Sequence, residues 1–335
     1  MSAIGVGNAL TDIIIDIPSK DILDELGFPV GGMYMIDEQR HLSLLDVMAS
    51  YPHSYAAGGS AANTIAGLAA LGVDAAFAGK VGGDRTGREF AADQKACGVE
   101  SWLETSEDMH SGKCISMVLP GGERTMATYL GASIASSGDQ LTAQRLAQHK
   151  ILYVEGYIVY SPLIEKAMKL AKKAGLLVAL DLASYNVVED NLEYLHHLTD
   201  KYVDIIFANE EEARQFTGSG ERESLEFFAR KSPVAVVKIG AQGALLAREG
   251  ERLRVGVIDA VPRDKTGAGD LFASGFLYGM CKGLPLSACG EIGAILSSKV
   301  IEVAGPRMGE DTWESIRPMV TRIESGGTVV AFESI

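Results

Sequence analysis

The strongest constraint on the fold is the alternation of short buried apolar runs with amphipathic helical segments. The apolar runs are predicted strands, at 75–82, 150–157, 175–183, 203–210 and 234–247. The segments between them are predicted helices, at 61–72, 87–98, 162–175 and 211–218. Such alternation requires right-handed crossovers, so it predicts an α/β fold in which helices cover both faces of a mainly parallel sheet.

Two segments, 29–37 and 112–131, break this alternation because they have the period-two texture of strands and no helix of their own. A Pro-Gly-Gly turn at 120–122 divides the second segment. We interpret both as parts of a small β-sheet that projects from the main domain as a lid, although an ordinary edge hairpin explains the same pattern. We expect one domain over residues 1–335, with the lid formed by discontinuous segments near 10–18, 29–37 and 101–131.

The charge of the chain restricts its partners. A formal net charge of −14 disfavours nucleic acids and anionic membrane surfaces as partners. If the ligand is itself a polyanion, local features must overcome the overall field. Such features are helix N-termini, a few Lys and Arg side chains, and a bound cation.

Cysteine usage and the N-terminus indicate the compartment. The four cysteines have no CxxC spacing and are predicted free thiols, which fits a reducing environment. Asp12 and Asp16 interrupt the first apolar run, which therefore indicates a strand and not a signal peptide. No stretch approaches the ~20 apolar residues of a membrane span. We expect a cytoplasmic protein.

The sequence DKTGAGD at 264–270 leads directly into a long apolar helix pattern. Gly267, Ala268 and Gly269 are small, so the free N–H groups at the start of the helix predict an anion hole. Asp270 then lies in the first turn, where it can accept a proton from a hydroxyl that attacks phosphorus. The alternative is a simple helix cap, which does not require three small residues in a row.

Two segments supply candidate contacts to the hydroxyl groups of a ligand. Asn8 and Asp12 lie on one face of a strand, where burial is costly unless a ribose or sugar hydroxyl satisfies them. A solvated strand end is the alternative. Gly58 and Gly59 allow close backbone approach, and Asn63 offers both a donor and an acceptor. Capping by the serine after Gly59 explains this second segment as well.

Two further segments favour a nucleotide site. Asn209 follows a predicted strand, and Glu212 stands one helical turn later, so the pair can hold a hydrated magnesium through water. An ordinary helix N-cap explains the same residues. Lys238, Gly240 and Gly243 mark a turn between two apolar strands, and the glycines permit close approach to phosphates or a flat base. A hairpin with glycine at positive φ is the alternative.

No GxxxxGK[ST] motif is present, which excludes a P-loop protein, and GVGNAL does not complete the dinucleotide-binding fingerprint. GGSAANTIAGLAALG at 58–72 and DKTGAGDLFASGFLYG at 264–279 instead resemble the two signatures of the ribokinase-like (PfkB) family of carbohydrate and nucleoside kinases. GKVGGDRTG, NEEE and KIGAQG occur between them in the family's order, so the resemblance spans nearly the whole chain. GNALTD and ERTMATYLGA further resemble adenosine kinases and their bacterial relatives.

The resemblance implies a ribokinase-like three-layer α/β/α domain with a small β-sheet lid, and transfer of the γ-phosphoryl group of ATP to a hydroxyl. It implies that Asp270 is the base and that Gly267, Ala268 and Gly269 form the anion hole. Implied acceptor contacts are Asn8, Asp12, Gly58, Gly59, Asn63, Tyr157 and the lid arginine Arg124. Implied ATP contacts are Asn209, Lys238, Gly240, Gly243 and Thr266, with Asn209 and Glu212 holding Mg²⁺ through water. Asp264 and Thr266 lie where the family's monovalent cation, K⁺, takes its ligands.

Three positions depart from the family pattern. Lys238 and Lys265 each stand where the family commonly carries a small polar residue, and Ile158 follows Tyr157 where adenosine kinases carry a second aromatic. We expect an adenosine kinase-like enzyme acting on the 5′-hydroxyl of a nucleoside. A sugar kinase of the ribokinase or fructokinase type and a non-catalytic nucleotide- or sugar-binding regulator are the alternatives. The expected state is a monomer or a lid-mediated homodimer.

Overall fold

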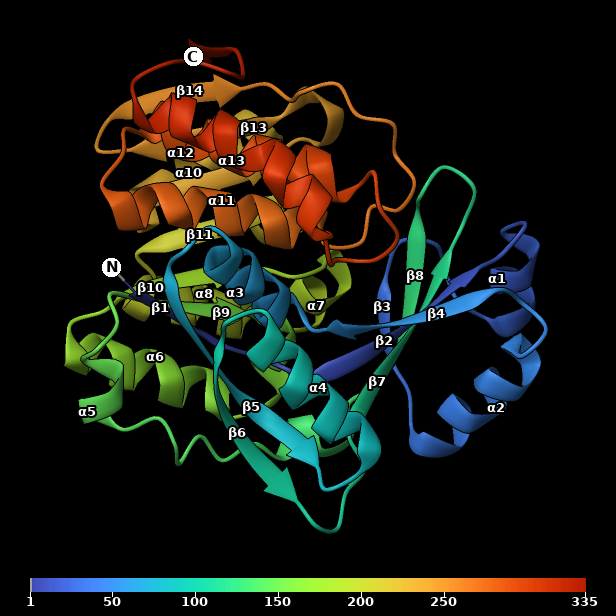
Figure 1. Cartoon of the computed structure of the whole chain (residues 1–335). Coiled ribbons are helices and arrows are strands. Elements are labelled where there is room, and N and C mark those ends of the chain that lie inside the picture. Colours follow the sequence, from blue (N-terminus) through green and yellow to red (C-terminus); the bar gives the residue numbers. More distant parts are fainter. Residues whose placement is uncertain (1) are drawn as a thin grey trace.

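The computed structural model describes residues 2–335 and contains two β-sheets of unequal size (Figure 1). The larger sheet has the strand order β15-β14-β13-β12-β11-β10-β9-β1-β5-β6. All neighbours from β6 to β12 are parallel, and β13, β14 and β15 continue the sheet antiparallel. The strands are β1 (Ser2–Val6), β5 (Asp74–Gly82), β6 (Glu100–Ser106), β9 (Ile151–Glu155), β10 (Leu177–Asp181), β11 (Ile205–Asn209), β12 (Val234–Lys238), β13 (Ala244–Arg248), β14 (Glu251–Val255) and β15 (Phe332–Ser334).

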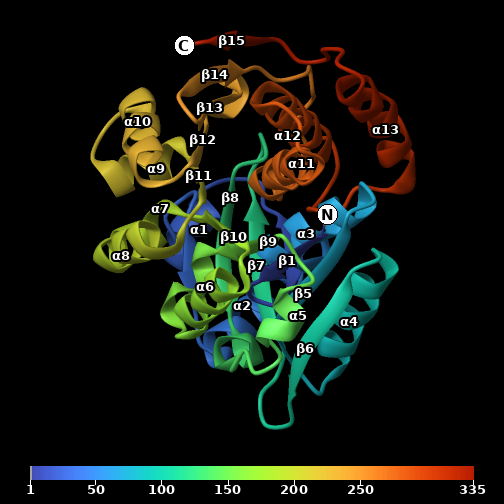
Figure 2. The ribbon, with the colours of Figure 1, turned by 90° about the vertical axis from the view of Figure 1, so that its left-hand side faces the viewer.

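Helices cover both faces of this sheet, and Figure 2 shows the two layers on either side of the strands. Alternate strand residues feed two separate cores; Tyr153, for example, packs into one and its neighbour Val154 into the other. One layer contains α3 (Ser60–Ala70), α4 (Arg85–Ala96), α11 (Ala268–Lys282), α12 (Leu286–Val300) and α13 (Glu310–Glu324). The other contains α5 (Ala143–Leu146), α6 (Leu163–Ala174), α7 (Tyr185–Asp190), α8 (Leu192–Tyr202), α9 (Glu210–Thr217) and α10 (Glu221–Lys231).

The predicted three-layer fold is therefore confirmed. The expected strands correspond to β5, β9, β10, β11, β12 and β13, and the expected helices to α3, α4, α6 and α9, with ends displaced by at most two residues. Their periodicity is readable because buried parallel strands are almost continuously apolar. Within residues 2–335, no helix is both long and apolar enough to cross a bilayer.

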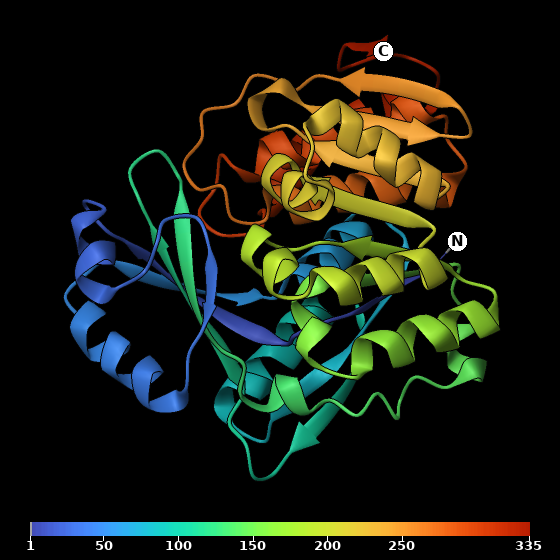
Figure 3. The same ribbon diagram turned by 180° about the vertical axis from the view of Figure 1, so that it is seen from behind.

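The smaller sheet has the order β3-β8-β7-β2-β4 and projects from the side of the main domain (Figures 1 and 3). Its strands are β2 (Leu10–Asp16), β3 (Met33–Met35), β4 (His53–Gly58), β7 (Gly112–Val118) and β8 (Arg124–Tyr129). Two helices, α1 (Asp21–Leu26) and α2 (Glu38–Met48), pack on it around a core of its own that includes Leu23, Leu44 and Ile115. A separate five-stranded sheet with its own core rules out the ordinary edge hairpin.

Two parts of the small sheet differ from the expected segments. Residues 101–106 belong to β6 and pair with β5 in the large sheet, so the expected lid segment 101–131 begins too early. The edge strand β4, which pairs antiparallel with β2, was not among the expected lid segments. Only three residues, 7–9, separate β1 in the large sheet from β2 in the small one. The chain therefore crosses between the sheets at the carboxyl end of β1, where parallel sheets bind ligands.

Candidate active site

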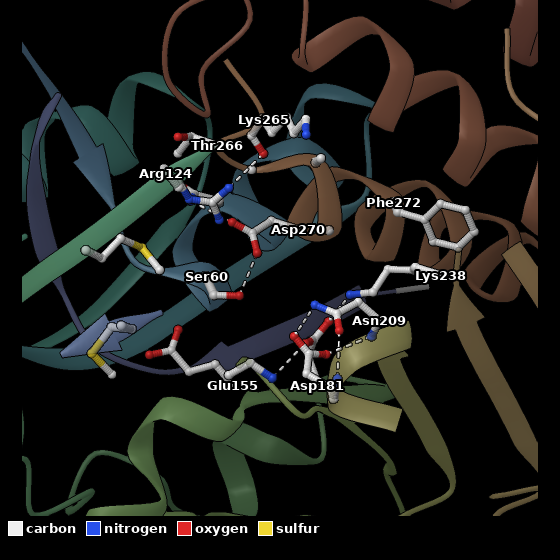
Figure 4. A pocket seen from close by; sticks show the side chains of 18 of the residues that line it. Ser60, Arg124, Glu155, Asp181, Asn209, Lys238, Lys265, Thr266, Asp270 and Phe272 are labelled. Carbon is white, nitrogen blue, oxygen red and sulfur yellow. Dashed lines mark hydrogen bonds and ion pairs between the residues drawn. The ribbon is translucent and has the colours of Figure 1, made fainter. Parts of the chain in front are cut away.

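A cavity of about 800 Å³ lies between the carboxyl ends of the parallel strands and the small sheet. Its lining combines residues that are far apart in the sequence, among them Asn8, Asn63, Arg124, Lys238 and Asp270. Figure 4 shows Arg124, Lys238 and Asp270 converging from separate elements. Every candidate site residue except Gly58 and Asp264 lines this cavity, and those two touch residues that do.

Asp270 projects from the first turn of α11 toward α3. Its carboxylate accepts a hydrogen bond from Ser60 Oγ at 2.6 Å and another from Asn63 Nδ2 at 2.9 Å. Burial raises the pKa of Asp270, and these two hydrogen bonds oppose the shift. The side chain does not cap its own helix, so the simple cap is the wrong interpretation. A fixed carboxylate of raised basicity at a cavity wall suits proton acceptance.

The turn before Asp270 presents the start of α11 to the cavity. Gly267 has φ 79°, and a Cβ there would lie 2.8 Å from Pro306 Cβ, so glycine is required. No side chain within residues 2–335 caps this helix start, which leaves its positive end facing the cavity. Asp264 braces the turn: it accepts Thr266 N–H at 2.9 Å, Thr266 Oγ1 at 2.6 Å and Gly305 N–H at 2.7 Å.

The expected hydroxyl contacts gather beside Asp270. Asn63 uses its amide nitrogen on Asp270, and its buried Oδ1 has no partner within residues 2–335. Burial raises the pKa of Asp12 to about 7, although Arg124 opposes the shift. A Cβ on Gly58 would overlap the Asp12 carboxylate, and one on Gly59, where φ is 93°, would overlap the Asn8 carbonyl oxygen. An unpartnered acceptor and a buried carboxyl suit a ligand with several hydroxyl groups.

Two residues of this wall were missed. Ser60 does not cap α3, whose N-cap is Gly59, because its hydroxyl is bonded to Asp270. Glu155, only 1 % exposed, accepts the N–H groups of Asn8 at 2.8 Å and of Ala61 at 2.7 Å. Burial raises the pKa of Glu155 to about 7. The sequence signal was a glutamate at the end of an apolar strand, which is expensive to bury without such partners.

Asn209 and Glu212 form a complete capping box at the start of α9. Asn209 Oδ1 accepts the Glu212 N–H at 2.8 Å, and the Glu212 carboxylate accepts the Asn209 backbone N–H at 2.8 Å and its Nδ2 at 2.7 Å. The structure therefore confirms the N-cap interpretation. Both residues also line the cavity, where burial raises the pKa of Glu212 to about 7.

Lys238 ends β12, and its ammonium lies 2.9 Å from Asp181 Oδ2 at the end of β10. The next residues make a hairpin turn with glycine at positive φ, as the alternative interpretation predicts: Gly240 has φ 55° and Gly243 has φ 94°. A Cβ on Gly243 would overlap the Val255 carbonyl oxygen, so this glycine is required for close packing of β13 on β14. Asp181 was not among the expected site residues.

The tip of the small sheet reaches the anion-hole turn. Arg124 Nη1 donates to the Lys265 carbonyl oxygen at 3.0 Å, while its buried Nε has no partner within the described chain. The Lys265 ammonium lies 3.3 Å from Glu123 Oε2. Lys265 is therefore engaged by the small sheet, and Arg124 is the guanidinium that this sheet brings to the cavity (Figure 4).

Besides Asp12, Glu123, Arg124 and Thr128, the residues that line the cavity from the small sheet and its neighbourhood are mainly apolar. Tyr157 faces the cavity and donates its hydroxyl to the Ala183 carbonyl oxygen at 2.9 Å, whereas Ile158 is buried in the core of the large sheet. Apolar lining residues of the small sheet and its neighbourhood are Leu10, Val30, Met33, Cys114, Met126 and Leu130. This surface suits a flat, largely apolar group.

Comparison with known proteins gives the family. The pattern of the pfkB family carbohydrate kinases matches residues 44–313. The chain belongs to this family. The fold is similar to an adenosine kinase from Sinorhizobium meliloti (TM-score 0.90, 34 % identity, 95 % of this chain and 98 % of that one). It is equally similar to a probable sugar kinase from Rhizobium etli (TM-score 0.90, 32 % identity, 97 % and 98 % covered). Adenosine kinase 2 from Arabidopsis thaliana is 26 % identical over 332 residues, covering 90 % of this chain and 94 % of that protein.

Members of the pfkB family are phosphotransferases that act on a hydroxyl group, and the family implies ATP with a divalent metal. The residues present fit a metal ion that is held through water molecules and not by direct protein ligands. No group of three or more His, Cys, Asp or Glu side chains within residues 2–335 forms a direct metal site. Both Glu212 carboxylate oxygens already accept hydrogen bonds from Asn209, and because a carboxylate oxygen can accept more than one hydrogen bond, this cavity residue can also accept from metal-bound water.

Proposed function

We propose that this pfkB family kinase transfers the γ-phosphoryl group of ATP to the 5′-hydroxyl of a nucleoside, as an adenosine kinase does. The observation that carries this proposal is the composition of the acceptor wall. Asp12 and the free Oδ1 of Asn63 offer acceptors for ribose hydroxyls beside Asp270, and the apolar side chains lie beyond them. A sugar larger than the ribose of a nucleoside would place hydroxyl groups against that apolar surface, where their hydrogen-bond donors would lack partners.

The chemistry follows from the arrangement of the residues. Asp270 accepts the proton of the acceptor hydroxyl while the acceptor oxygen forms its bond to the γ-phosphorus and the bond to the β–γ bridging oxygen breaks, leaving ADP. The N–H groups at the Gly267-Ala268-Gly269 turn stabilise the negative charge on the phosphoryl oxygens, for which the Ala268 N–H exchanges the Lys265 carbonyl oxygen that it contacts at 3.2 Å. Arg124 supplies positive charge from the small sheet and closes the cavity against water, which would otherwise compete as acceptor.

The remaining expected residues serve the donor side. Asn209 and Glu212 would hold Mg²⁺ through its waters, and the ion would offset phosphate charge. Gly240 and Gly243 let the nucleotide approach the backbone, and Thr266 lies at the phosphate end. Asp264 is 3 % exposed and forms no ion pair within residues 2–335, so a K⁺ ion beside it and Thr266 would compensate a buried charge. Two copies could pair through the small sheet, or the chain could remain a monomer.

The decisive test is a panel of acceptors assayed side by side with ATP and magnesium: adenosine, inosine, guanosine, ribose and fructose. We expect a nucleoside to give the highest kcat/KM, with the new phosphate on the 5′-oxygen by ³¹P NMR. Preference for ribose or fructose would establish the sugar kinase instead, which the similarity to the Rhizobium etli protein favours. Asp270→Asn should lose at least about 100-fold in kcat, the contribution of a general base, while retaining ATP binding.

A further inference from the structure

The ion pair between Lys238 and Asp181 is not explained by the capping and turn interactions of the site. Both side chains are nearly buried, with 14 % and 5 % of their surfaces exposed, and they come from strands 57 residues apart in the sequence. A buried ion pair is costly to form unless its geometry is well supported, so it is weak support for stability by itself. Because both residues line the cavity, this ion pair is placed to take part in ligand binding.

The Lys238 ammonium lies against the start of α11. A Cβ added to Gly269 would be 3.0 Å from Lys238 Nζ, so the ammonium lies close to this residue of the turn. The ammonium therefore stands beside the same helix N-terminus that forms the anion hole, on the side that carries Asn209, the neighbour of Lys238 across β11 and β12 (Figure 4). Burial lowers the pKa of Lys238, but the carboxylates of Asp181 and Glu212 outweigh it and keep the group charged.

The position of Asp181 is itself fixed by an unusual backbone. Ala183 has φ 74°, a left-handed conformation that side chains with a Cβ rarely adopt. This conformation directs the Ala183 N–H to Asp181 Oδ1 at 3.0 Å, which leaves Oδ2 for Lys238. The Ala183 carbonyl oxygen accepts the Tyr157 hydroxyl at 2.9 Å. Left-handed strain of this kind concentrates at functional sites.

We infer that Asp181 is a positioning residue: it holds the ammonium of Lys238, an ATP contact implied by the family resemblance, beside the anion hole, where that ammonium meets the donor phosphates. The charge balance supports this inference. Asp12, Glu155, Asp181, Glu212 and Asp270 all line the cavity, and a triphosphate adds further negative charge. Lys238 from the large sheet and Arg124 from the small sheet lie on opposite sides of Asp270 (Figure 4). Lys238 transfers no proton, because the acceptor proton goes to Asp270.

The inference rests on the proposed phosphoryl transfer from ATP, and binding tests it separately. Calorimetric titration with Mg·AMPPNP, without any acceptor, should show about 10- to 100-fold weaker binding for Lys238→Thr. Asp181→Asn should weaken binding less but lower kcat, because the ammonium remains and loses its position. The double variant Lys238→Thr/Asp181→Asn, which removes the repulsive carboxylate, should recover part of the binding and still fall at least about 10-fold short of wild type.

The double variant separates a phosphate contact from simple charge neutralisation. If it binds Mg·AMPPNP within threefold of wild type, Lys238 only neutralises Asp181, and the inference is wrong. Wild-type kcat and binding for Asp181→Asn would refute the positioning role. Lys172→Thr/Asp204→Asn is the matched control, since this 2.7 Å pair lies outside the cavity lining and should leave binding unchanged. Thermal melts verify folding, and a panel with no phosphorylated acceptor would refute the proposed function while leaving the titration interpretable.

Discussion

Replacing Ser60 by alanine removes one of the two hydrogen bonds that favour the charged form of Asp270. A hydrogen bond to a charged group contributes about 1.5–3 kcal/mol. Because the Ser60 hydroxyl stabilises the carboxylate and not the neutral acid, its loss raises the pKa of Asp270 further. The base is then protonated over a wider range of acidic pH, and kcat/KM there should fall about 10- to 150-fold. Well above this range, kcat/KM should stay near the wild-type value.

The assay is the pH dependence of kcat/KM with the acceptor that the panel identifies. The acid limb of the Ser60→Ala profile should lie at higher pH than that of wild type. Ser60→Thr is the matched control, because it keeps the hydroxyl and should keep the limb in place. An unmoved limb with undiminished activity at acidic pH would refute the role of Ser60, and with it the assignment of Asp270 as the group that titrates.

Three further changes test the architecture of the site. Gly59→Ala forces a Cβ into a backbone with φ 93° and against the Asn8 carbonyl oxygen, so the free energy of unfolding in urea should fall by about 1–3 kcal/mol; an unchanged midpoint would contradict this. Asp264→Ala leaves the N–H groups of Thr266 and Gly305 without their buried acceptor, and thermal melts should show a loss of at least about 2 kcal/mol, with Asp264→Asn milder. Burial raises the pKa of Asp12 to about 7, above its value of about 4 in the unfolded chain. Between these two pH values the unfolded chain binds fewer protons than the folded protein, so stability should fall as pH rises from about 4 to 7. Glu155 and Glu212 act in the same direction, so Asp12→Asn should make this slope shallower without removing it in urea titrations, and a slope as steep as that of wild type would exclude a contribution from Asp12.

The sequence predicted the large sheet well because its central strands are apolar on both faces. The small sheet was harder to delimit. In β6 only Trp102 is buried, so SWLETS alternates like a strand with one solvated face, although it pairs at the edge of the large sheet. In β4 the first three residues, His53 to Tyr55, are exposed, and such an edge strand carries almost no burial signal.

The candidate site was predictable where one short segment carries the chemistry, as in the turn from Gly267 to Asp270. It was not predictable where the chemistry depends on partners that folding brings together. Glu155 binds N–H groups 147 and 94 residues away, and Asp181 finds Lys238 57 residues away. Neither carboxylate belongs to a local motif, because the spacing of such partners is set by the topology of the sheet.

Under the proposed function, the small sheet would carry one group for each ligand. Asp12 on β2 would contact the acceptor, and Arg124 on β8, which donates to the Lys265 carbonyl oxygen, would meet the phosphates, with β7 hydrogen-bonded between those two strands. Any displacement of the sheet moves both groups together. Thermodynamic linkage then requires that if bound nucleotide changes the affinity for the acceptor by some factor, bound acceptor changes the affinity for the nucleotide by the same factor. The order in which the nucleotide and the acceptor bind would change the sequence of binding steps but not their total binding free energy.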